Sequence, residues 1–499
     1  MASCRTREVL VVLLLLAASA CAQLDWGIDR RLYSGIIGQD GIAADRAPGS
    51  DTAFAGLIAS SPSGDTIRVL RTTDQGEHWQ PIWTMSQPDH TCSNLSLRVC
   101  AAPGGWIVVM WLDRAGANNG DVAGARVSFD GSSAFTLQPV APGPDTLTGL
   151  ALTRSFDSLP VIYVVWQDEL GRDRAERAPR ILITRSSDLG ETWTAPMPVL
   201  DSFETPAVDH GAPGHLYLAA RSVRRQDIAV VFSTDQGESW RQSWLTNDST
   251  AHNDMFPSVA CTHDSATGER AWVSYDSYGT SSWDVDYAYT INAGGTWVLG
   301  RTLDGGSGDQ FLSNLDCTNS GSRRVRAVDL SDDVDGFHVY YRCAQAANPT
   351  NWSSAIVVSD TQATDAMAPV VTSYGVSSDT LDKGLVFYAG IGPFDLWYDA
   401  QQFTGLSEGP MTLSPPAGLQ TALLARDELK IRVSLARREK LEVDLYTIDG
   451  RQVRRLNVGI YPAGELELRI PVPGLAAGSY LLRLRAGRES GTFKTICVR

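Results

Sequence analysis

Acidic side chains recur at the ends of apolar segments of this chain, where they could bind a ligand or transfer a proton. Asp113, Asp168 and Asp276 each follow a strand-like run that contains Trp or Tyr. Two carboxylates can act as acid and base in the hydrolysis of a glycosidic bond. An Asp after a strand also commonly caps a turn, so the pattern permits a ligand-binding rim and assigns no catalytic residue.

Further polar residues occupy similar places. Asp254 lies between two repeats with His252 beside it, and Asp309 and Asp365 lie on later connections. Two arginines also follow strand-like runs. The candidate residues of a ligand-binding rim are Asp113, Arg114, Asp168, Arg221, His252, Asp254 and Asp276.

The sequence predicts neither a metal site nor a cofactor. It has no CxxC motif and no His/Cys cluster with the spacing of a zinc site. It has no dense Asp-x-Asp-x-Asp loop of the kind that binds Ca²⁺. The seven histidines are scattered, and no Ser-His-Asp arrangement can be argued from them.

One short motif is repeated along most of the chain. It reads Ser/Thr-x-Asp-x-Gly-x-x-Trp at Thr72–Trp79, Ser186–Trp193 and Ser233–Trp240, and it is degenerate at Thr290–Trp297 and Ser128–Phe135. We call these five segments the repeat turns; a sixth copy leaves only Trp352. The residues that define them are Asp74, Gly76, Trp79, Asp130, Asp188, Gly190, Trp193, Asp235, Gly237, Trp240, Asn292, Gly294 and Trp297.

The chemistry of the motif is that of a tight hairpin. Ser/Thr and Asp oxygens accept hydrogen bonds from nearby backbone amides, and Gly takes a positive φ without a steric cost. The Trp supplies a large apolar anchor against neighbouring strands. We therefore interpret the Asp as a structural residue rather than a catalyst.

Each repeat also contains Val-rich strands, such as 107–111 and 161–166, and four short strands in about 50 residues are typical of a propeller blade. The motif resembles the Asp-box (BNR) repeats of sialidase-like β-propellers over about residues 25–405. The resemblance implies an all-β fold with seven blades, or six as the alternative, and a closing strand from Trp26–Tyr33. It also implies a site on the face opposite the repeat turns.

A sialidase of this family uses three arginines, a Tyr nucleophile with a Glu partner, and an Asp. The Arg-Ile-Pro signature that precedes the first Asp-box in the family is missing, because Gly64–Arg71 reads GDTIRVLR. The resemblance therefore leaves open whether the protein is an enzyme.

The N-terminus predicts export. Arg5 and Arg7 precede an apolar run that ends in small residues, which is the pattern of a secretory signal peptide, assigned to residues 1–22. Lipidation of Cys21 is the alternative. In an oxidising compartment Cys92 and Cys100 are the favoured disulfide candidate, since a short loop would close it.

The composition changes near residue 405. Residues 23–404 are assigned to the propeller, 405–416 to a Pro/Gly-rich linker, and 417–499 to a small Ig-like β-sandwich. The segment Val443–Val453, followed by Leu475–Arg483, resembles the C-terminal sorting domain of type IX secretion cargo and the flagellar-hook-cap Ig-like module. A plain Ig-like spacer is the alternative.

Charge divides the chain in the same way. The whole chain has a net charge of -15, but residues 417–499 hold 15 basic and 9 acidic residues (+6), so the remaining 27 basic and 48 acidic residues give -21. An acidic protein of this kind is a poor nucleic-acid binder.

The sequence thus predicts an exported cell-surface or secreted propeller that binds extracellular glycan or protein. Its C-terminal domain engages the secretion machinery, and no transmembrane segment is expected in the mature chain. The alternatives are an exo-acting glycoside hydrolase that removes terminal sialosides, and a purely structural surface protein.

Overall fold

The structure of the chain is a computed structural model. It describes residues 24–403 and 419–497 except for gaps at 27–28, 48–49, 51, 75, 101–104, 116–119, 141–146, 156–159, 170–177, 247–251, 265–267, 280–281, 301, 304–307, 318–322, 334–335, 360–365, 375–382, 391–394, 426–427, 436–437, 448–451, 463, 472–477 and 487–488. The predicted signal peptide and the linker 405–416 lie outside the described residues. Two compact units are present, Ile28–Gln401 and a second unit that contains the C-terminal strands.

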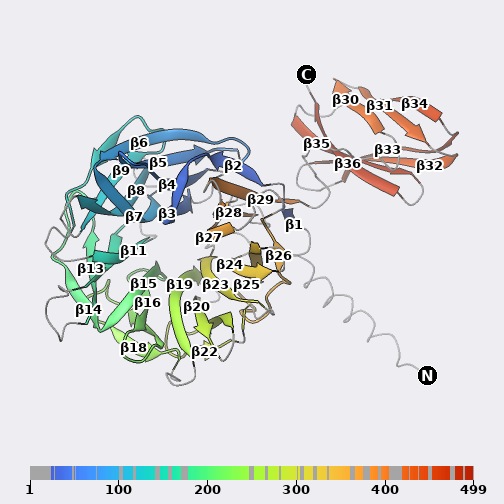
Figure 1. Cartoon of the computed structure of the whole chain (residues 1–499). Coiled ribbons are helices and arrows are strands. Elements are labelled where there is room, and N and C mark those ends of the chain that lie inside the picture. Colours follow the sequence, from blue (N-terminus) through green and yellow to red (C-terminus); the bar gives the residue numbers. More distant parts are fainter. Residues whose placement is uncertain are drawn as a thin grey trace, which may run out of the picture. The chain divides into compact units, whose positions relative to one another are not determined.

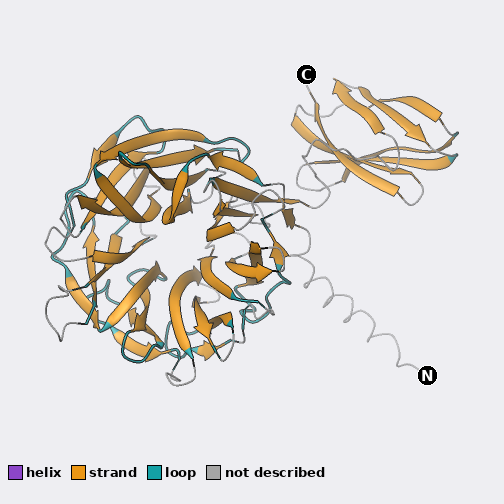
Figure 2. Ribbon diagram, viewed as in Figure 1, coloured by secondary structure: helices purple, strands orange, loops and turns teal. Residues whose placement is uncertain are grey.

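The first unit is a seven-bladed β-propeller, and the described residues are strands and loops without a helix (Figure 1, Figure 2). Blades 1 to 6 are four-stranded antiparallel sheets whose strands follow in chain order from the centre outward. The choice of seven blades over six is confirmed.

The strands of the first three blades are as follows. Blade 1 has β3 (Ile36–Arg46), β4 (Ala53–Ser60), β5 (Gly64–Thr72) and β6 (Gln80–Pro88). Blade 2 has β7 (His90–Cys100), β8 (Trp106–Ala115), β9 (Asp121–Ser128) and β10 (Ala134–Thr136). Blade 3 has β11 (Leu147–Arg154), β12 (Ile162–Asp168), β13 (Arg180–Ser186) and β14 (Met197–Asp201).

The next three blades continue the pattern. Blade 4 has β15 (Phe203–His210), β16 (Leu216–Ser222), β17 (Ile228–Ser233) and β18 (Arg241–Trp244). Blade 5 has β19 (Asn253–Asp264), β20 (Gly268–Tyr278), β21 (Trp283–Thr290) and β22 (Val298–Leu299). Blade 6 has β23 (Gln310–Cys317), β24 (Arg324–Asp333), β25 (Gly336–Gln345) and β26 (Ile356–Val357).

Blade 7 combines the two ends of the propeller. It holds β27 (Ala366–Tyr374), β28 (Lys383–Gly390) and β29 (Leu396–Phe403), and β2 (Arg30–Tyr33) pairs with β29. The expected closing strand from the N-terminal segment is therefore present. The innermost strand of each blade packs against that of the next, and β27 packs against β3, so the ring is complete.

Side chains reinforce this closure. The carboxylate of Asp395, whose side chain is 1% exposed, accepts hydrogen bonds from Gly35 N (3.0 Å) and Arg31 Nη1 (3.2 Å). Arg30 Nη1 donates to Glu77 Oε2 of blade 1 at 2.9 Å. Because the segment 30–35 contacts both blade 7 and blade 1, it ties the end of the ring to its beginning.

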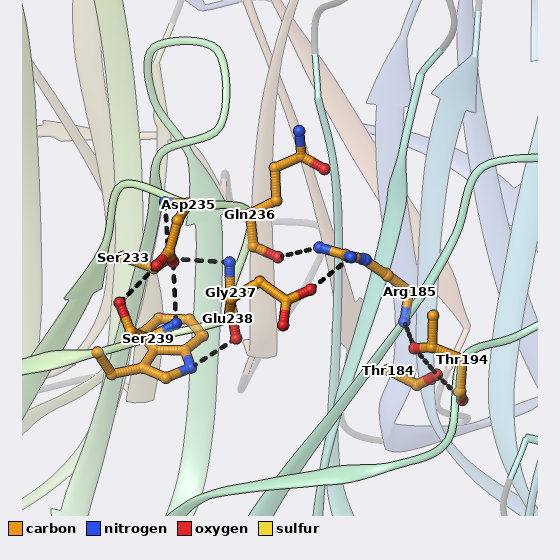
Figure 3. A network of polar contacts seen from close by, with 10 residues as sticks. Thr184, Arg185, Thr194, Ser233, Asp235, Gln236, Gly237, Glu238 and Ser239 are labelled. Carbon is orange, nitrogen blue, oxygen red and sulfur yellow. Dashed lines mark hydrogen bonds and ion pairs between the residues drawn. The ribbon is translucent and has the colours of Figure 1, made fainter.

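The repeat turns connect the third and fourth strands of blades 1 to 5. In blade 4, Gly237 N donates to Ser233 Oγ (2.8 Å), and Ser239 N donates to Asp235 Oδ1 (2.9 Å), as Figure 3 shows. Gly237 has φ 86°, which a residue with a Cβ rarely adopts. The polar residues thus satisfy the backbone of the turn, as the motif predicts.

Four of the tryptophan anchors lie between blades. Trp79 packs edge-on against Phe387 (5.5 Å between ring centroids) of blade 7, and Trp297 packs against Tyr217 (6.2 Å) of blade 4. Trp193 and Trp240 likewise pack against clusters that include the preceding blade. Phe135 differs: it is 49% exposed on the edge strand β10, and its ring contacts the tilted ring of Trp106 in its own blade (5.8 Å between centroids), so it does not anchor one blade to another.

A second interblade contact was not anticipated. The Glu that follows the turn Gly pairs with an Arg of the preceding blade: Arg185 Nη2 with Glu238 Oε1 at 2.6 Å, and Arg126 Nη2 with Glu191 Oε1 at 2.6 Å. Arg185 Nη1 also donates to Gln236 O of the same turn at 2.9 Å (Figure 3). Each such turn is therefore bonded to its neighbour as well as to itself.

The second unit contains two antiparallel sheets. One has the order β30 (Leu419–Ala425), β31 (Glu428–Leu435), β34 (Gly464–Pro471). The other has the order β33 (Gln452–Tyr461), β32 (Glu439–Thr447), β35 (Gly478–Ala486), β36 (Glu489–Cys497). The short strand β1 (Leu24–Trp26) pairs with β29. The Ig-like assignment of this unit remains a prediction.

The predicted disulfide is wrong. Cys92 and Cys100 are free, and both lie on the single strand β7. Eight residues of extended chain separate their Cα atoms by roughly 25 Å, whereas a disulfide needs less than about 7 Å. The short segment between them is a strand rather than a loop, and this is what the spacing alone did not reveal.

The closure of the ring gives a test by mutation. Replacing Asp395 by Ala should lower the free energy of unfolding by about 2 kcal/mol, because a buried charged acceptor of a backbone amide is lost. Urea unfolding of the purified protein measures this. The control Arg31→Ala removes only the half-exposed partner and should cost less than about 1 kcal/mol. Equal losses in the two variants would contradict the role given to Asp395.

The repeat turns give a pH test. Hydrogen bonds from Ser239 and Ser233 lower the pKa of Asp235 to about 2, against about 3.9 in an unfolded chain. The stabilisation is therefore complete above about pH 4 and is lost as the pH falls toward 2. Asp235→Asn should lower the melting temperature at pH 6 and lose that difference by pH 2.

The control for this test is Asp201→Asn, an exposed Asp on β14 outside the repeat turns. It should leave the pH dependence of the melting temperature as in the wild type. A constant gap between Asp235→Asn and the wild type from pH 6 to pH 2 would refute the proposed linkage.

Candidate functional site

The two ends of the propeller differ in their loops. The repeat turns lie at the end of the third strand of each blade, together with the hairpins between first and second strands, and we call this end the turn face. The opposite end carries the connections between blades and the loops after the second strands. The innermost strands begin there, and we call it the bulge face for the feature described next.

Every innermost strand has a β-bulge near its start. The register against the second strand shifts within 37–42, 93–96, 148–150, 204–207, 255–258, 311–314 and 367–370. In five blades one residue of the bulge has a positive φ: Asn94 (53°), Gly149 (55°), Thr205 (50°), Phe256 (49°) and Leu312 (54°). Bulges re-aim side chains and are frequent next to functional sites.

Neighbouring blades hold the bulges in place. Thr205 N donates to Gln167 Oε1 of blade 3 at 2.8 Å, and Leu312 N donates to Asp276 Oδ2 of blade 5 at 2.8 Å. Asn94 Oδ1 accepts from Leu150 N of blade 3 at 3.2 Å. The positive-φ conformation costs on the order of 1 kcal/mol for residues other than Gly, so these bonds matter for keeping it.

The innermost strands surround a central cavity of about 920 Å³. All five positive-φ residues line it. Towards the bulge face its lining also includes Arg114, Thr148 and Glu204. Towards the turn face it is lined by charged residues near the strand ends: Asp45, Arg46, Arg98, Arg154, Asp209 and Asp316. Phe256 is the one aromatic residue among the described lining residues.

Of the seven rim candidates only Arg114 is among the lining residues, and its Nη2 donates to Leu147 O at 3.2 Å. Asp113 Oδ1 lies 2.7 Å from His90 Nδ1. Asp168 is 2% exposed, and its Oδ2 accepts from Arg180 Nε (3.0 Å) and Nη2 (2.8 Å). These contacts bind strand ends to their own blade.

Arg221 is fully engaged with its surroundings. Its guanidinium donates to Asp254 O (2.9 Å), to Asn253 Oδ1 (2.8 Å) and to Glu204. Asp254 is buried and accepts from Ser277 Oγ at 2.7 Å, while His252 is exposed beside β19. The network joins the end of β16 to the start of β19, so it positions the connection between blades 4 and 5. Asp365 lies outside the described residues.

Asp276 supports the bulge of the next blade. Burial raises the pKa of this carboxyl to about 7, although the amides of Leu312 and Ser313 donate to it and oppose the rise. Burial likewise raises the pKa of Asp209 to about 6, at the turn-face end of the cavity. Gln167 accepts a hydrogen bond from Thr205 N in the same way that Asp276 accepts one from Leu312 N, but the side chain of Gln167 is an uncharged amide.

The propeller therefore has a central cavity lined by charged, polar and apolar residues. The carboxylates predicted from sequence mainly hold strand ends and bulges in place. No group of three or more His, Cys, Asp or Glu suited to a metal ion occurs in the described part of the chain. Sequence reasoning missed the five bulge residues. The five residues have no residue type in common. Only their similar distance in sequence from the preceding repeat turn could have indicated them.

Comparison with known proteins gives one family match. Residues 425–499 match the model described as a secretion system C-terminal sorting domain. The protein is therefore exported, to the cell surface or the medium, by way of a type IX sorting tail. The structure shows, over its described residues, no helix long and apolar enough to cross a membrane. No curated protein sequence matches the chain.

Several solved structures resemble the chain. An α-L-arabinanase of Penicillium chrysogenum has a TM-score of 0.46 at 12% identity, covering 76% of this chain and 98% of that one. A Hadza microbial sialidase has a TM-score of 0.45 at 18% identity, covering 64% and 66%. A polysaccharide lyase that acts on ulvan has a TM-score of 0.47 at 10% identity, covering 74% and 95%.

The support of the bulge by Asp276 is testable. Because its folded pKa is raised to about 7 from about 3.9, the folded state binds more protons than the unfolded state between these values. Stability is therefore lost as the pH rises from 4 to 7. Asp276→Asn keeps an acceptor for Leu312 N without the charge, and should raise the melting temperature at pH 8 but not at pH 4.

Asp276→Ala is the matched control, since it removes the acceptor as well as the charge. It should lower the melting temperature relative to Asp276→Asn at both pH values. An Asn variant that is less stable than the wild type at pH 8 would show that the ionised carboxylate is required at the bulge.

Proposed function

We propose that the propeller binds an extracellular glycan or protein in its central cavity, entered from the bulge face, while the C-terminal unit directs its secretion. The observation that carries this proposal is the cavity of about 920 Å³ and its lining by five bulge residues at positive φ, four of them not Gly. Concave sites of 300–1,000 Å³ with a few convergent polar groups are typical of ligand binding.

The local chemistry supports binding rather than hydrolysis. The rim carboxylates Asp113, Asp168 and Asp276 contact His90, Arg180 and Leu312 N respectively. A carboxylate in such a contact is positioned to hold a strand end, and none of the three lines the cavity. The bulge-face end of the cavity carries amide, hydroxyl, guanidinium and aromatic groups and two carboxylates, Asp40 and Glu204. Both carboxylates accept hydrogen bonds from the protein, Asp40 from Asn94 Nδ2 (3.3 Å) and Glu204 from Arg221.

A sialidase would need three arginines beside a tyrosine and a glutamate. Arg114 is the arginine at the bulge-face end of the described lining, and the described lining residues include no Tyr. The other lining arginines, Arg46, Arg98 and Arg154, lie towards the turn face. The arrangement therefore favours a binding protein over hydrolysis of terminal sialosides.

Binding is tested with the purified full-length protein on a glycan array and against immobilised extracellular matrix proteins. Arg114→Ala should weaken binding to any ligand found by roughly tenfold, because a charge-assisted hydrogen bond is lost. Arg224→Ala is the control, since Arg224 is exposed on the same face but outside the cavity. It should leave the affinity unchanged.

The competing functions give different results. Release of fluorophore from a 4-methylumbelliferyl sialoside would establish the hydrolase and overturn a purely binding role. Absence of binding to every glycan and protein tested, together with absence of hydrolysis, would leave the structural surface protein. Equal loss in Arg114→Ala and Arg224→Ala would place the binding site outside the cavity.

A further inference from the structure

The five bulge residues divide the cavity mouth into two chemical halves. On blade 2 the bulge carries Asn94, and on blade 4 the hydroxyl of Thr205 is buried but the adjacent Glu204 lines the cavity. Gly149 lies between them on blade 3. Phe256 and Leu312, from blades 5 and 6, are apolar. Since all five occupy equivalent places on successive innermost strands, a ligand in the mouth meets polar groups on one side and apolar groups on the other.

Phe256 is the most unusual of the five. It is 45% exposed although it lines the cavity, and its φ of 49° is a conformation that bulky side chains rarely adopt. Both features are unfavourable for folding: the exposed ring buries little area, and the backbone is strained. A function for the exposed ring would explain why a Phe, rather than Gly or Asn, occupies this place.

The charges at the mouth indicate a ligand without a net negative charge. Arg114 donates to Leu147 O, and Arg221 donates to three protein oxygens. Arg180, at the bulge-face end of β13, donates through Nε and Nη2 to Asp168. Arg221 and Arg180 are thus occupied by the protein itself, Arg114 donates to the protein through Nη2, and residues 1–416 carry a net charge of -21. A polyanion would be repelled on approach.

We propose, on the basis of the function proposed above, that the ligand is a neutral saccharide whose ring stacks on Phe256 while its hydroxyl groups face Asn94 and Glu204. A pyranose or furanose ring has an apolar face of C–H groups and an equatorial rim of hydroxyls. The divided mouth matches this distribution, because the apolar face covers an aromatic ring and the hydroxyls exchange hydrogen bonds with amide and carboxylate groups.

Neutral oligosaccharides are the probes for this inference: cellohexaose, mannohexaose, xylohexaose and maltohexaose, with oligogalacturonate as the charged counterpart. Isothermal titration calorimetry with the full-length protein gives the affinities. Phe256→Ala should raise the Kd of the neutral ligand roughly tenfold, because the ring that the sugar covers is removed. Phe256→Tyr and Phe256→Trp should retain binding within about threefold.

Phe135→Ala is the matched control. Phe135 has a similar exposure of 49%, but it lies on β10 by the turn face and outside the cavity lining. Its replacement should leave the Kd unchanged. Circular dichroism melts of each variant establish that the fold is retained.

A second variant separates function from folding. Phe256→Gly relieves the positive φ, so its melting temperature should equal or exceed that of Phe256→Ala, whereas its Kd should rise as much as that of Phe256→Ala. A purely structural Phe256 would instead lower the melting temperature in both variants and leave the Kd unchanged.

Each result is decisive. If a neutral oligosaccharide binds Phe256→Ala as strongly as it binds the wild type, the stacking role is overturned and the proposed function stands. Binding of oligogalacturonate or of a protein alone overturns the neutral-saccharide class and again leaves the proposed function. Failure to bind any probe or any array glycan or protein overturns both.

Discussion

The burial of each blade against its neighbours is the interaction on which this structure depends. The second strands β8, β12 and β16 are largely apolar, and these strands and β20 are buried over most of their length. An isolated four-stranded sheet of this kind would leave both faces in water. The clusters that bury them each join two blades. A ring is therefore the arrangement in which no blade lacks a neighbour, and its stability requires that blade 7 meet blade 1.

The devices that hold the blades together are of two kinds. Apolar wedges, such as Trp79 against Phe387 and Tyr398, fill the space between adjacent sheets near the turn face. Polar contacts, such as Arg185 with Glu238, fix one turn relative to the next. The wedges contribute buried area, and the exposed ion pairs contribute less energy but define the angle between blades.

A rigid ring permits strain at its centre. A residue such as Phe256 or Leu312 stays at positive φ only if the surrounding structure leaves it no alternative. Hydrogen bonds from Thr205 N to Gln167 and from Leu312 N to Asp276 show how the preceding blade imposes this conformation. The same contacts explain why the conspicuous carboxylate Asp276 is buried beside the cavity rather than in it. The positions that the sequence marks most clearly thus support the cavity, and less conspicuous residues line it.

The sequence by itself determined the repeat, because a tight turn needs particular residues at fixed spacing: Ser233, Asp235 and Gly237 can be recognised without a structure. From that spacing followed the all-β class, the seven blades and the closing strand that pairs with β29. It did not determine that Cys92 and Cys100 share one strand, that Phe135 is exposed, or that Asn94, Thr205 and Phe256 meet around one cavity. Those depend on register and on contacts between residues more than 50 positions apart, which have no local chemical signature. Turn chemistry is encoded locally, whereas the composition of a central cavity is decided only when seven blades close into a ring.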